Sequence, residues 1–295
     1  PLYGRRTSQM KIEPFNFFDS MKFFPEYTLE DKFKGYSITG GIPQYLLRFK
    51  EECSIEENIK NNILDKSSYL YEEPLNLLKQ ELRQPALYNS IIEAIATGSS
   101  KLNEIATKVG EDTSKCSNYI KSLIELQIIE KEIPVGENGN TRRTIYSIKD
   151  NFFRFWYRFV FNNMELMEQE MIDYVYENKI EPELNNFLGF SFEKICIDYL
   201  KLRNSEMKLP FVFEKIGKWW GNNPYLKREE KIDILAVSKD WALVGECKWR
   251  NQLLDMKTVN SLIEKSQILK YENKYYIFFS KSGFTKDVVN LSINN

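Results

Sequence analysis

Apolar positions in the C-terminal third of the chain alternate between helical and strand spacing. Residues 185–201 predict a helix, because apolar side chains recur there every three or four positions. Short runs rich in apolar residues predict strands, and residues 255–270 predict a second helix before the last strand. The predicted strands cover 211–215, 231–236, 243–249 and 274–280, with Trp219 and Trp220 in a loop or strand. The order predicted for residues 181–295 is therefore α-β-β-β-α-β.

Residues 85–150 show a different pattern of apolar positions, with three helical segments followed by two strands. Apolar residues from Leu87 to Ile95 repeat at helical spacing, a short helix closes at Gly110, and Asp112 or Thr113 can cap a third helix. Two strands follow, on either side of a Gly-Glu-Asn-Gly-Asn turn. This order predicts a winged helix-turn-helix. Basic and acidic residues interleave on its third helix and wing, so DNA binding and a protein–protein role remain equally open.

The other segments favour helices. Residues 55–84 predict an amphipathic helix interrupted near Pro74, and Pro43 suits the first turn of a helix over 44–49. Residues 151–161 hold the densest aromatic run, which favours a buried helix with Arg154 and Arg158 outward over a base-stacking platform. The chain is thus expected to be a multidomain α/β protein. Its predicted units are 1–84, 85–150, an aromatic helical connector at 151–180, and 181–295.

Composition limits the chemistry. The chain of 295 residues has no histidine, so Ser-His and Cys-His catalysis and histidine–metal ligation are excluded. A formal net charge of −1 offers no global basic field for nucleic acid. Four scattered cysteines without C-x-x-C spacing argue against a zinc site and fit a reducing cytoplasm. No apolar run approaches the roughly 20 residues of a membrane helix, and no signal peptide is evident.

Two carboxylates and a lysine are the strongest candidates for a site. Glu246 and Lys248 share one face of a predicted strand, and the preceding strand can bring Asp233 beside them. Buried carboxylates need compensation, and oxygen ligands suit Mg²⁺ or Mn²⁺. Asp233 and Glu246 are therefore the predicted metal ligands, with Lys248 beside them to orient a metal-bound water and stabilise charge on a phosphate. The alternative is an ion network that only holds two strands together.

The element order matches the core of the restriction-endonuclease-like fold, whose second strand supplies Asp and whose third supplies Glu-x-Lys. Glu193, on the preceding helix, stands where this superfamily often keeps a further carboxylate. Gln267-Ile-Leu-Lys-Tyr271 resembles a Gln-x-x-x-Tyr element that some members carry on the following helix, where four-residue spacing would put both side chains on one face. Trp220 and Trp249 are expected to be packing residues.

Four motifs together resemble the archaeal-type AAA ATPases that end in a domain of unknown function. The resemblance implies a P-loop ATPase core, a helical lid, a winged helix and a nuclease-like C-terminal domain. The motifs are residues 1–7 (PLYGRRT), 39–46 (TGGIPQYL), 153–159 (FRFWYRF) and 245–249 (GECKW).

This chain departs from that family because it contains no G-x-x-x-x-G-K-[ST]. Residues 1–84 are expected to be the lid remnant of an ATPase module. Arg5, Arg6 and Pro43 would then serve a nucleotide only in a complete ATPase, and ATP would bind only if a P-loop half were supplied.

Two functions are expected from these observations. The first is a DNA-associated, metal-dependent nuclease-like protein, with an ATPase core or a second copy as a further partner. The second is a non-catalytic module that binds nucleic acid or protein.

Overall fold

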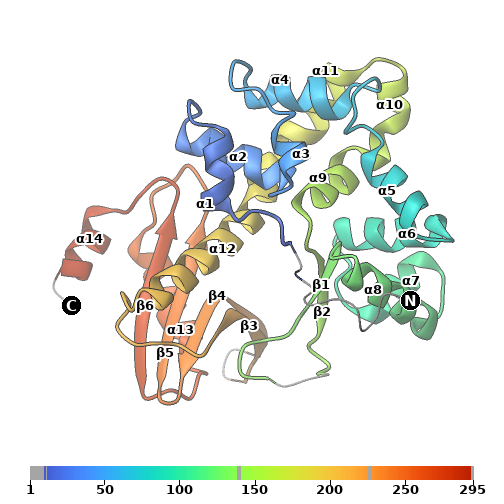
Figure 1. Cartoon of the computed structure of the whole chain (residues 1–295). Coiled ribbons are helices and arrows are strands. Elements are labelled where there is room, and N and C mark those ends of the chain that lie inside the picture. The colour runs from blue at the N-terminus through green and yellow to red at the C-terminus, as the bar shows by residue number, and fades with distance from the viewer. Residues whose placement is uncertain (1–9, 11, 138–140, 225–226, 294–295) are drawn as a thin grey trace.

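The computed structural model describes residues 10, 12–137, 141–224 and 227–293. A helical part and a four-stranded sheet lie on opposite sides of one long helix, α12 (Glu181–Ser205) (Figure 1). Ion pairs and side-chain packing join the two parts along this helix.

The N-terminal segment is a set of short helices. Its elements are α1 (Phe17–Ser20), η1 (Met21–Phe23), α2 (Leu29–Thr39), α3 (Pro43–Leu46), α4 (Ile55–Ile59), the π-helical turn η2 (Lys60–Leu64) and α5 (Glu73–Glu81). The prediction of one helix over 55–84 with a break only at Pro74 is wrong. The Asp65 carboxylate accepts the backbone N–H of Ser67 in a turn that ends η2, and the helix resumes only at Glu73. Pro74 lies in the first turn of α5, where its missing N–H breaks no hydrogen bond.

Residues 85–148 have the predicted order of three helices and two strands. The elements are α6 (Pro85–Ala96), α7 (Leu102–Val109), α8 (Thr113–Glu125), β1 (Ile129–Glu132) and β2 (Ile145–Ile148). Gly110 ends α7 with φ of 77°, and the Asp112 side chain caps α8. β1 and β2 pair antiparallel. The wing hairpin is therefore present in the predicted place.

The aromatic run forms α9 (Asn151–Phe159), and its rings are buried, which confirms the core interpretation. Trp156 is fully buried and donates its indole N–H to the Tyr71 carbonyl at 2.7 Å. The expectation that Arg154 points outward is wrong: its guanidinium donates to the Phe187 carbonyl and the Ser191 hydroxyl on α12. The chain continues through η3 (Phe161–Asn163), α10 (Met164–Glu168), α11 (Ile172–Val175) and η4 (Tyr176–Ile180) to α12.

The C-terminal part has the predicted order α-β-β-β-α-β, followed by one further helix. After α12 come β3 (Lys215–Asn223), β4 (Arg228–Ser238), β5 (Trp241–Lys248), α13 (Met256–Ser266), β6 (Asn273–Ser280) and α14 (Lys286–Ile293). The sheet order is β3-β4-β5-β6, antiparallel except for the parallel pair β5–β6. The first strand begins later than predicted, because the Asn204 side chain on α12 takes both backbone polar groups of Phe213.

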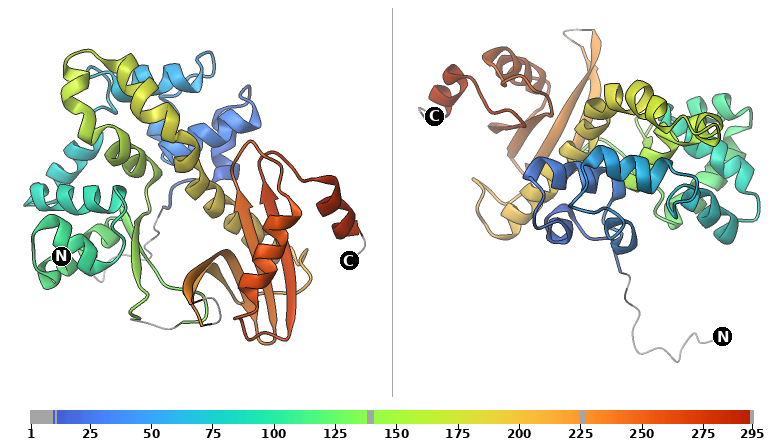
Figure 2. Two further views of the ribbon diagram at one scale, coloured as in Figure 1. Left: turned by 180° about the vertical axis from the view of Figure 1, so that it is seen from behind. Right: turned by 90° about the horizontal axis from the view of Figure 1, so that it is seen from above.

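The sheet lies between two helices, with α12 on one face and α13 on the other (Figures 1 and 2). On the α12 face, Ile234, Leu243 and Cys247 pack with Cys196 and Leu200. On the α13 face, Leu235 and Val244 pack with Leu262. A register shift in β3 between Gly217 and Trp219 interrupts the β3–β4 ladder opposite Asp233. Both faces of the central strands are therefore buried, and Asp233 lies at the irregularity.

Gly245 marks the tightest position of the sheet. A Cβ atom there would lie 2.9 Å from Cβ of Ile234 and 3.0 Å from Cγ2 of Ile277. Gly245→Ala should therefore lower the free energy of unfolding by about 1–3 kcal/mol, since a packed core tolerates little added volume. Gly189→Ala on α12 meets no atom within 4 Å and should raise it by about 0.5–1 kcal/mol. Urea unfolding of both variants checks the pair, and equal effects would contradict it.

Candidate functional site

The structure brings Asp233, Glu246 and Lys248 onto adjacent strands. Asp233 lies on β4, Glu246 and Lys248 lie on β5, and the neighbouring residues Ile234 and Gly245 are paired. Asp233 is 7% exposed and Glu246 is 6% exposed. Two carboxylates are thus buried in one sheet, which is costly unless each is compensated.

The carboxylate of Asp233 is compensated by β5 and by a lysine of its own strand, β4. One carboxylate oxygen, Oδ2, accepts the backbone N–H of Cys247 at 3.1 Å, and Oδ1 lies 3.2 Å from Nζ of Lys231. The contact with Cys196 and burial raise the pKa of the Cys247 thiol, so this thiol stays protonated. Asp233 is therefore bound to β5 directly and is connected to α12 through Lys231, which also contacts Glu193.

Glu246 is compensated less completely. Its Oε1 accepts from Nζ of Lys248, while Oε2 lies 3.9 Å from Nζ of Lys265 on α13. Oε2 is buried and makes no hydrogen bond within the described part of the chain. Buried acceptors are normally satisfied, so this oxygen has spare capacity for a cation or a hydrogen-bond donor.

Glu193 of α12 joins this region through lysines. Its carboxylate lies 2.9 Å from Nζ of Lys218 on β3 and 3.0 Å from Nζ of Lys231, which also contacts Asp233. Burial opposes the charge on Lys231, but the carboxylates of Glu193 and Asp233 raise its pKa above that of an ordinary lysine. Lys218 and Lys231 were not identified as site residues from the sequence, although Lys231 lies two positions before Asp233.

Gln267 does not join the cluster. Helix α13 ends at Ser266, whose hydroxyl contacts the Ile263 carbonyl and the Tyr276 hydroxyl, and Gln267 is exposed in the turn that follows. The expected shared helical face of Gln267 and Tyr271 is therefore wrong, because the chain between them is not helical.

Of the other predicted residues, Pro43 begins α3. Arg5 and Arg6 lie outside the described residues. Among the described residues, no group of three or more His, Cys, Asp or Glu side chains could hold a metal ion. A metal bound by Asp233 and Glu246 would therefore depend on water or substrate for its other ligands.

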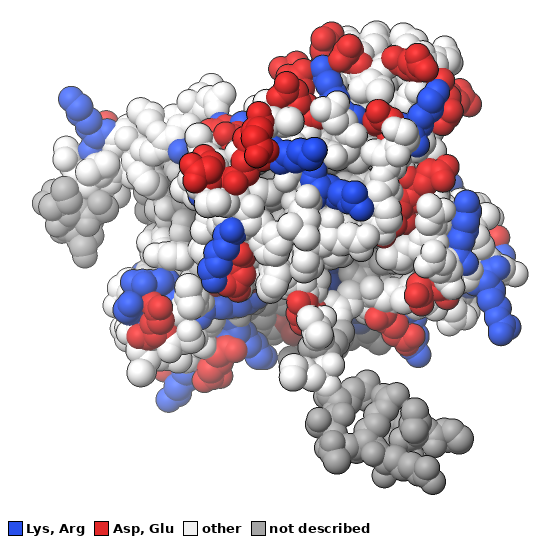
Figure 3. Space-filling model, turned by 45° about the horizontal axis from the view of Figure 1, so that its top comes forward, with Lys and Arg blue, Asp and Glu red and all other residues white. Residues whose placement is uncertain are grey.

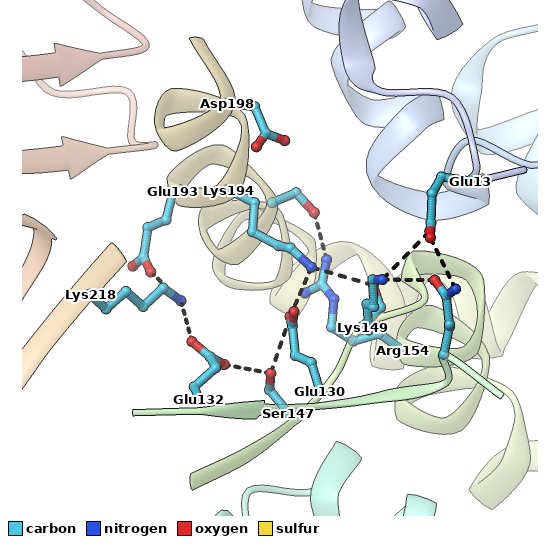
Figure 4. A network of polar contacts seen from close by, with 12 residues as sticks. Glu13, Glu130, Glu132, Ser147, Lys149, Arg154, Glu193, Lys194, Asp198 and Lys218 are labelled. Atoms are coloured by element: carbon cyan, nitrogen blue, oxygen red, sulfur yellow. Dashed lines mark hydrogen bonds and ion pairs between the residues drawn. The ribbon is translucent and has the colours of Figure 1, made fainter. Parts of the chain in front are cut away.

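A second network holds the wing against α12 and β3 (Figure 4). Nζ of Lys218 lies 4.0 Å from Oε2 of Glu132 on β1. Nζ of Lys194 on α12 lies 2.9 Å from Oε1 of Glu130 on the same strand, β1. The backbone N–H of Val135 also donates to the Lys218 carbonyl at 2.9 Å. The wing thus contacts α12 and β3 through β1 and the residues that follow this strand.

Between these parts lies a groove of about 860 Å³, bordered by the α6–α7 connection, β2, α9, α12, β3 and β4. We call this cavity the interdomain groove. Lys218 and Lys231 line it, so the groove reaches the Glu193–Asp233 cluster. On the face of the molecule in Figure 3, acidic and basic side chains are interspersed, which agrees with the near-zero net charge.

Comparison with known proteins shows that part of the chain matches a family whose function is unknown. Residues 156–262 match the DUF234 family model, described as archaea bacterial proteins of unknown function. An uncharacterized protein of Methanocaldococcus jannaschii is 35% identical over 293 residues, which is 97% of this chain. The chain spans 64% of the length of that relative.

Solved structures give only weak likenesses. A MarR family regulator from Neisseria meningitidis is 17% identical, with 47% of this chain and 89% of that chain covered and a TM-score of 0.23. The MepR–DNA complex of S. aureus is 16% identical, with 47% and 99% covered and the same TM-score. Values this low assign neither a fold nor a function to the chain. In the part that the structure describes, no helix is both long and apolar enough to cross a membrane.

The Lys218–Glu193 pair should matter for stability, because the Lys218 side chain is only 9% exposed. Lys218→Met keeps the aliphatic stem but leaves Glu193 with one lysine, so the free energy of unfolding should fall by about 1–3 kcal/mol. Lys201→Met breaks an exposed pair with Asp198 on α12 and should cost less than about 1 kcal/mol. Denaturant unfolding compares the two, and equal losses would contradict a special role for Lys218.

Proposed function

We propose that this chain belongs to a DNA-associated protein and that its sheet domain cleaves phosphodiester bonds with a divalent metal. The proposal rests on one observation above the others. Asp233 and Glu246 are buried on adjacent strands, Lys248 contacts Glu246, and Glu246 Oε2 has no hydrogen-bond partner in the described part of the chain. The finer assignment, to the restriction-endonuclease-like fold, is supported by the observed α-β-β-β-α-β order.

In this mechanism Asp233 and Glu246 would supply the oxygen ligands that hard ions such as Mg²⁺ or Mn²⁺ prefer. A metal held there would supply Lewis acidity toward a phosphate and a water molecule. Lys248, which contacts Glu246, would orient that water and stabilise charge that develops on the phosphate oxygens. Glu193 positions Lys231 next to Asp233 and keeps the cation there, so Glu193 is a positioning residue rather than a metal ligand in this arrangement.

The second candidate is a non-catalytic module that binds nucleic acid or a protein. A specific observation favours it: Asp233, Glu246 and Glu193 each have a lysine within 3.2 Å, so the cluster can act solely as an ion network. Helix α8, the helix that a winged helix presents to DNA, adds little positive charge. Its exposed side chains are mostly uncharged, with Lys121 and Glu125 of opposite sign.

ATP remains a proposal for a longer protein. The chain has no phosphate-binding Gly-x₄-Gly-Lys sequence, so a nucleotide would need a P-loop half from elsewhere. An ATPase core or a second copy of the chain is then the proposed partner. Residues 1–84 would then be the remnant of the ATPase module with its helical lid, and Pro43 begins α3.

A cleavage assay distinguishes the two candidates. Plasmid and single-stranded DNA are incubated with Mg²⁺ or Mn²⁺, and EDTA should abolish cleavage by the wild type. Asp233→Asn and Lys248→Met should each lower the rate by about 10²-fold or more, since they remove a ligand and a charge-stabilising group. Lys286→Ala, an exposed change on α14, is the control and should leave cleavage intact. Thermal melts must show that all variants are folded.

Two outcomes would contradict the catalytic proposal. Undiminished cleavage by folded Asp233→Asn would assign the activity to another site or a contaminant. Binding of DNA without cleavage by the wild type would favour the second candidate. A calorimetric titration with Mn²⁺ adds a readout besides activity, because Asp233→Asn and Glu246→Gln should both abolish metal binding.

A further inference from the structure

The interdomain groove has the composition of a strand-binding surface. Seven of its lining residues are cationic and five are acidic. Four of the acidic side chains already have partners in the protein. Glu104 accepts two backbone N–H groups, Glu132 contacts Ser147 and Lys218, Glu183 pairs with Arg158, and Glu230 pairs with Arg228.

Three of the lining cations form no salt bridge within the described residues: Lys101, Arg142 and Arg154. The charges of Glu104 and Glu193 act on Lys101 and Arg154 from a longer distance. Arg142 is exposed on the wing, and Lys101 lies at the start of α7. Burial lowers the pKa of Arg154 to about 9, so its guanidinium still carries its charge at neutral pH. Because Arg154 donates to oxygens of α12, the positive charge that remains for a ligand comes from Lys101 and Arg142, with exposed Glu229 also on the lining.

Aromatic rings line the same groove. Trp220 of β3 is half-buried, and its indole N–H donates to the Arg143 carbonyl at 2.9 Å, which fixes the ring beside the wing. Tyr146 of β2 and Phe190 of α12 also line the groove, and Nζ of Lys218 lies 4.3 Å from the Phe190 ring centre. A groove lined by both cations and aromatic rings has the combination that binds unpaired bases and their backbone.

The size of the groove limits the ligand. A volume of about 860 Å³ lies within the range of roughly 300–1,000 Å³ that is typical of small-ligand pockets. It can take a few nucleotides of one strand but not a base-paired duplex. Lys218 and Lys231 belong both to the groove and to the cluster with Glu193 and Asp233, so a bound strand would lie beside the lysine that contacts Asp233.

We propose that the interdomain groove binds single-stranded DNA, with Lys101 and Arg142 contacting phosphates and Trp220 stacking on a base. This inference rests on the proposed function, whose substrate it narrows to an unpaired strand. The docked wing supports it, because β1 and Val135 are held against α12 and β3 and together form one wall of a single groove.

The test measures binding without cleavage. Fluorescence anisotropy in EDTA follows a labelled oligothymidylate of about 20 nucleotides, longer than a typical single-strand site, and a matched duplex. The wild-type chain should bind the single strand more tightly than the duplex. Lys101→Ala/Arg142→Ala should weaken binding and make the slope of log K against log salt less negative by about 1.4, since each phosphate contact to a single strand contributes about 0.7.

Further variants separate the alternatives. Trp220→Leu should weaken single-strand binding while leaving the salt slope unchanged, and Lys286→Ala should change neither. A preference for duplex that Lys121→Ala removes would overturn the proposal and assign DNA binding to α8. Undiminished binding by Lys101→Ala/Arg142→Ala, or no binding by the wild type, would also overturn it. Tight single-strand binding with no cleavage in Mn²⁺ would contradict the proposed nuclease function and support single-strand binding by the interdomain groove.

Discussion

The ion pair between Lys218 and Glu193 is the contact on which the arrangement of the molecule depends. Lys218 comes from the first strand of the sheet, Glu193 comes from the helix that crosses it, and Glu132 of the wing reaches the same lysine. The lysine is 9% exposed and also lies over the Phe190 ring. A charge with so little access to water needs both carboxylates nearby, so the wing, α12 and β3 are held at one separation. That separation defines the interdomain groove.

The same carboxylate also connects this contact to the candidate site. Glu193 binds Lys231, and Lys231 reaches Asp233 at the irregular position of β4. The sheet itself has little freedom there, because Gly245 leaves no space between Ile234 and Ile277. The candidate site thus lies on closely packed strands. The interdomain groove, in contrast, is lined by residues of several helices and strands.

The sequence anticipated much of the architecture for physical reasons that are local. Helical and strand periodicity gave the α-β-β-β-α-β order and the three helices with a wing, because burial on one face imposes its period on the chain. The aromatic run was correctly interpreted as a buried helix. The sequence-based predictions were wrong at two places where local patterns do not decide the backbone. The first strand begins later than predicted because the Asn204 side chain binds the backbone of Phe213. Helix α13 ends at Ser266, so Gln267 lies in the turn that follows it. Arg154 was expected at the surface, yet α12 supplies the oxygens that satisfy it.

By itself, then, the sequence determined which residue types are available and in what order. Without histidine, this chain can use neither Ser-His nor Cys-His catalysis, and strand alternation alone drew attention to Asp233 and Glu246-x-Lys248. Only the tertiary structure decided their partners. Lys231 and Lys218 meet Glu193 because β3, β4 and α12 pack together, and the groove exists because the wing docks on that same helix. Contacts between residues far apart in the chain follow from packing of whole elements, which no local pattern encodes.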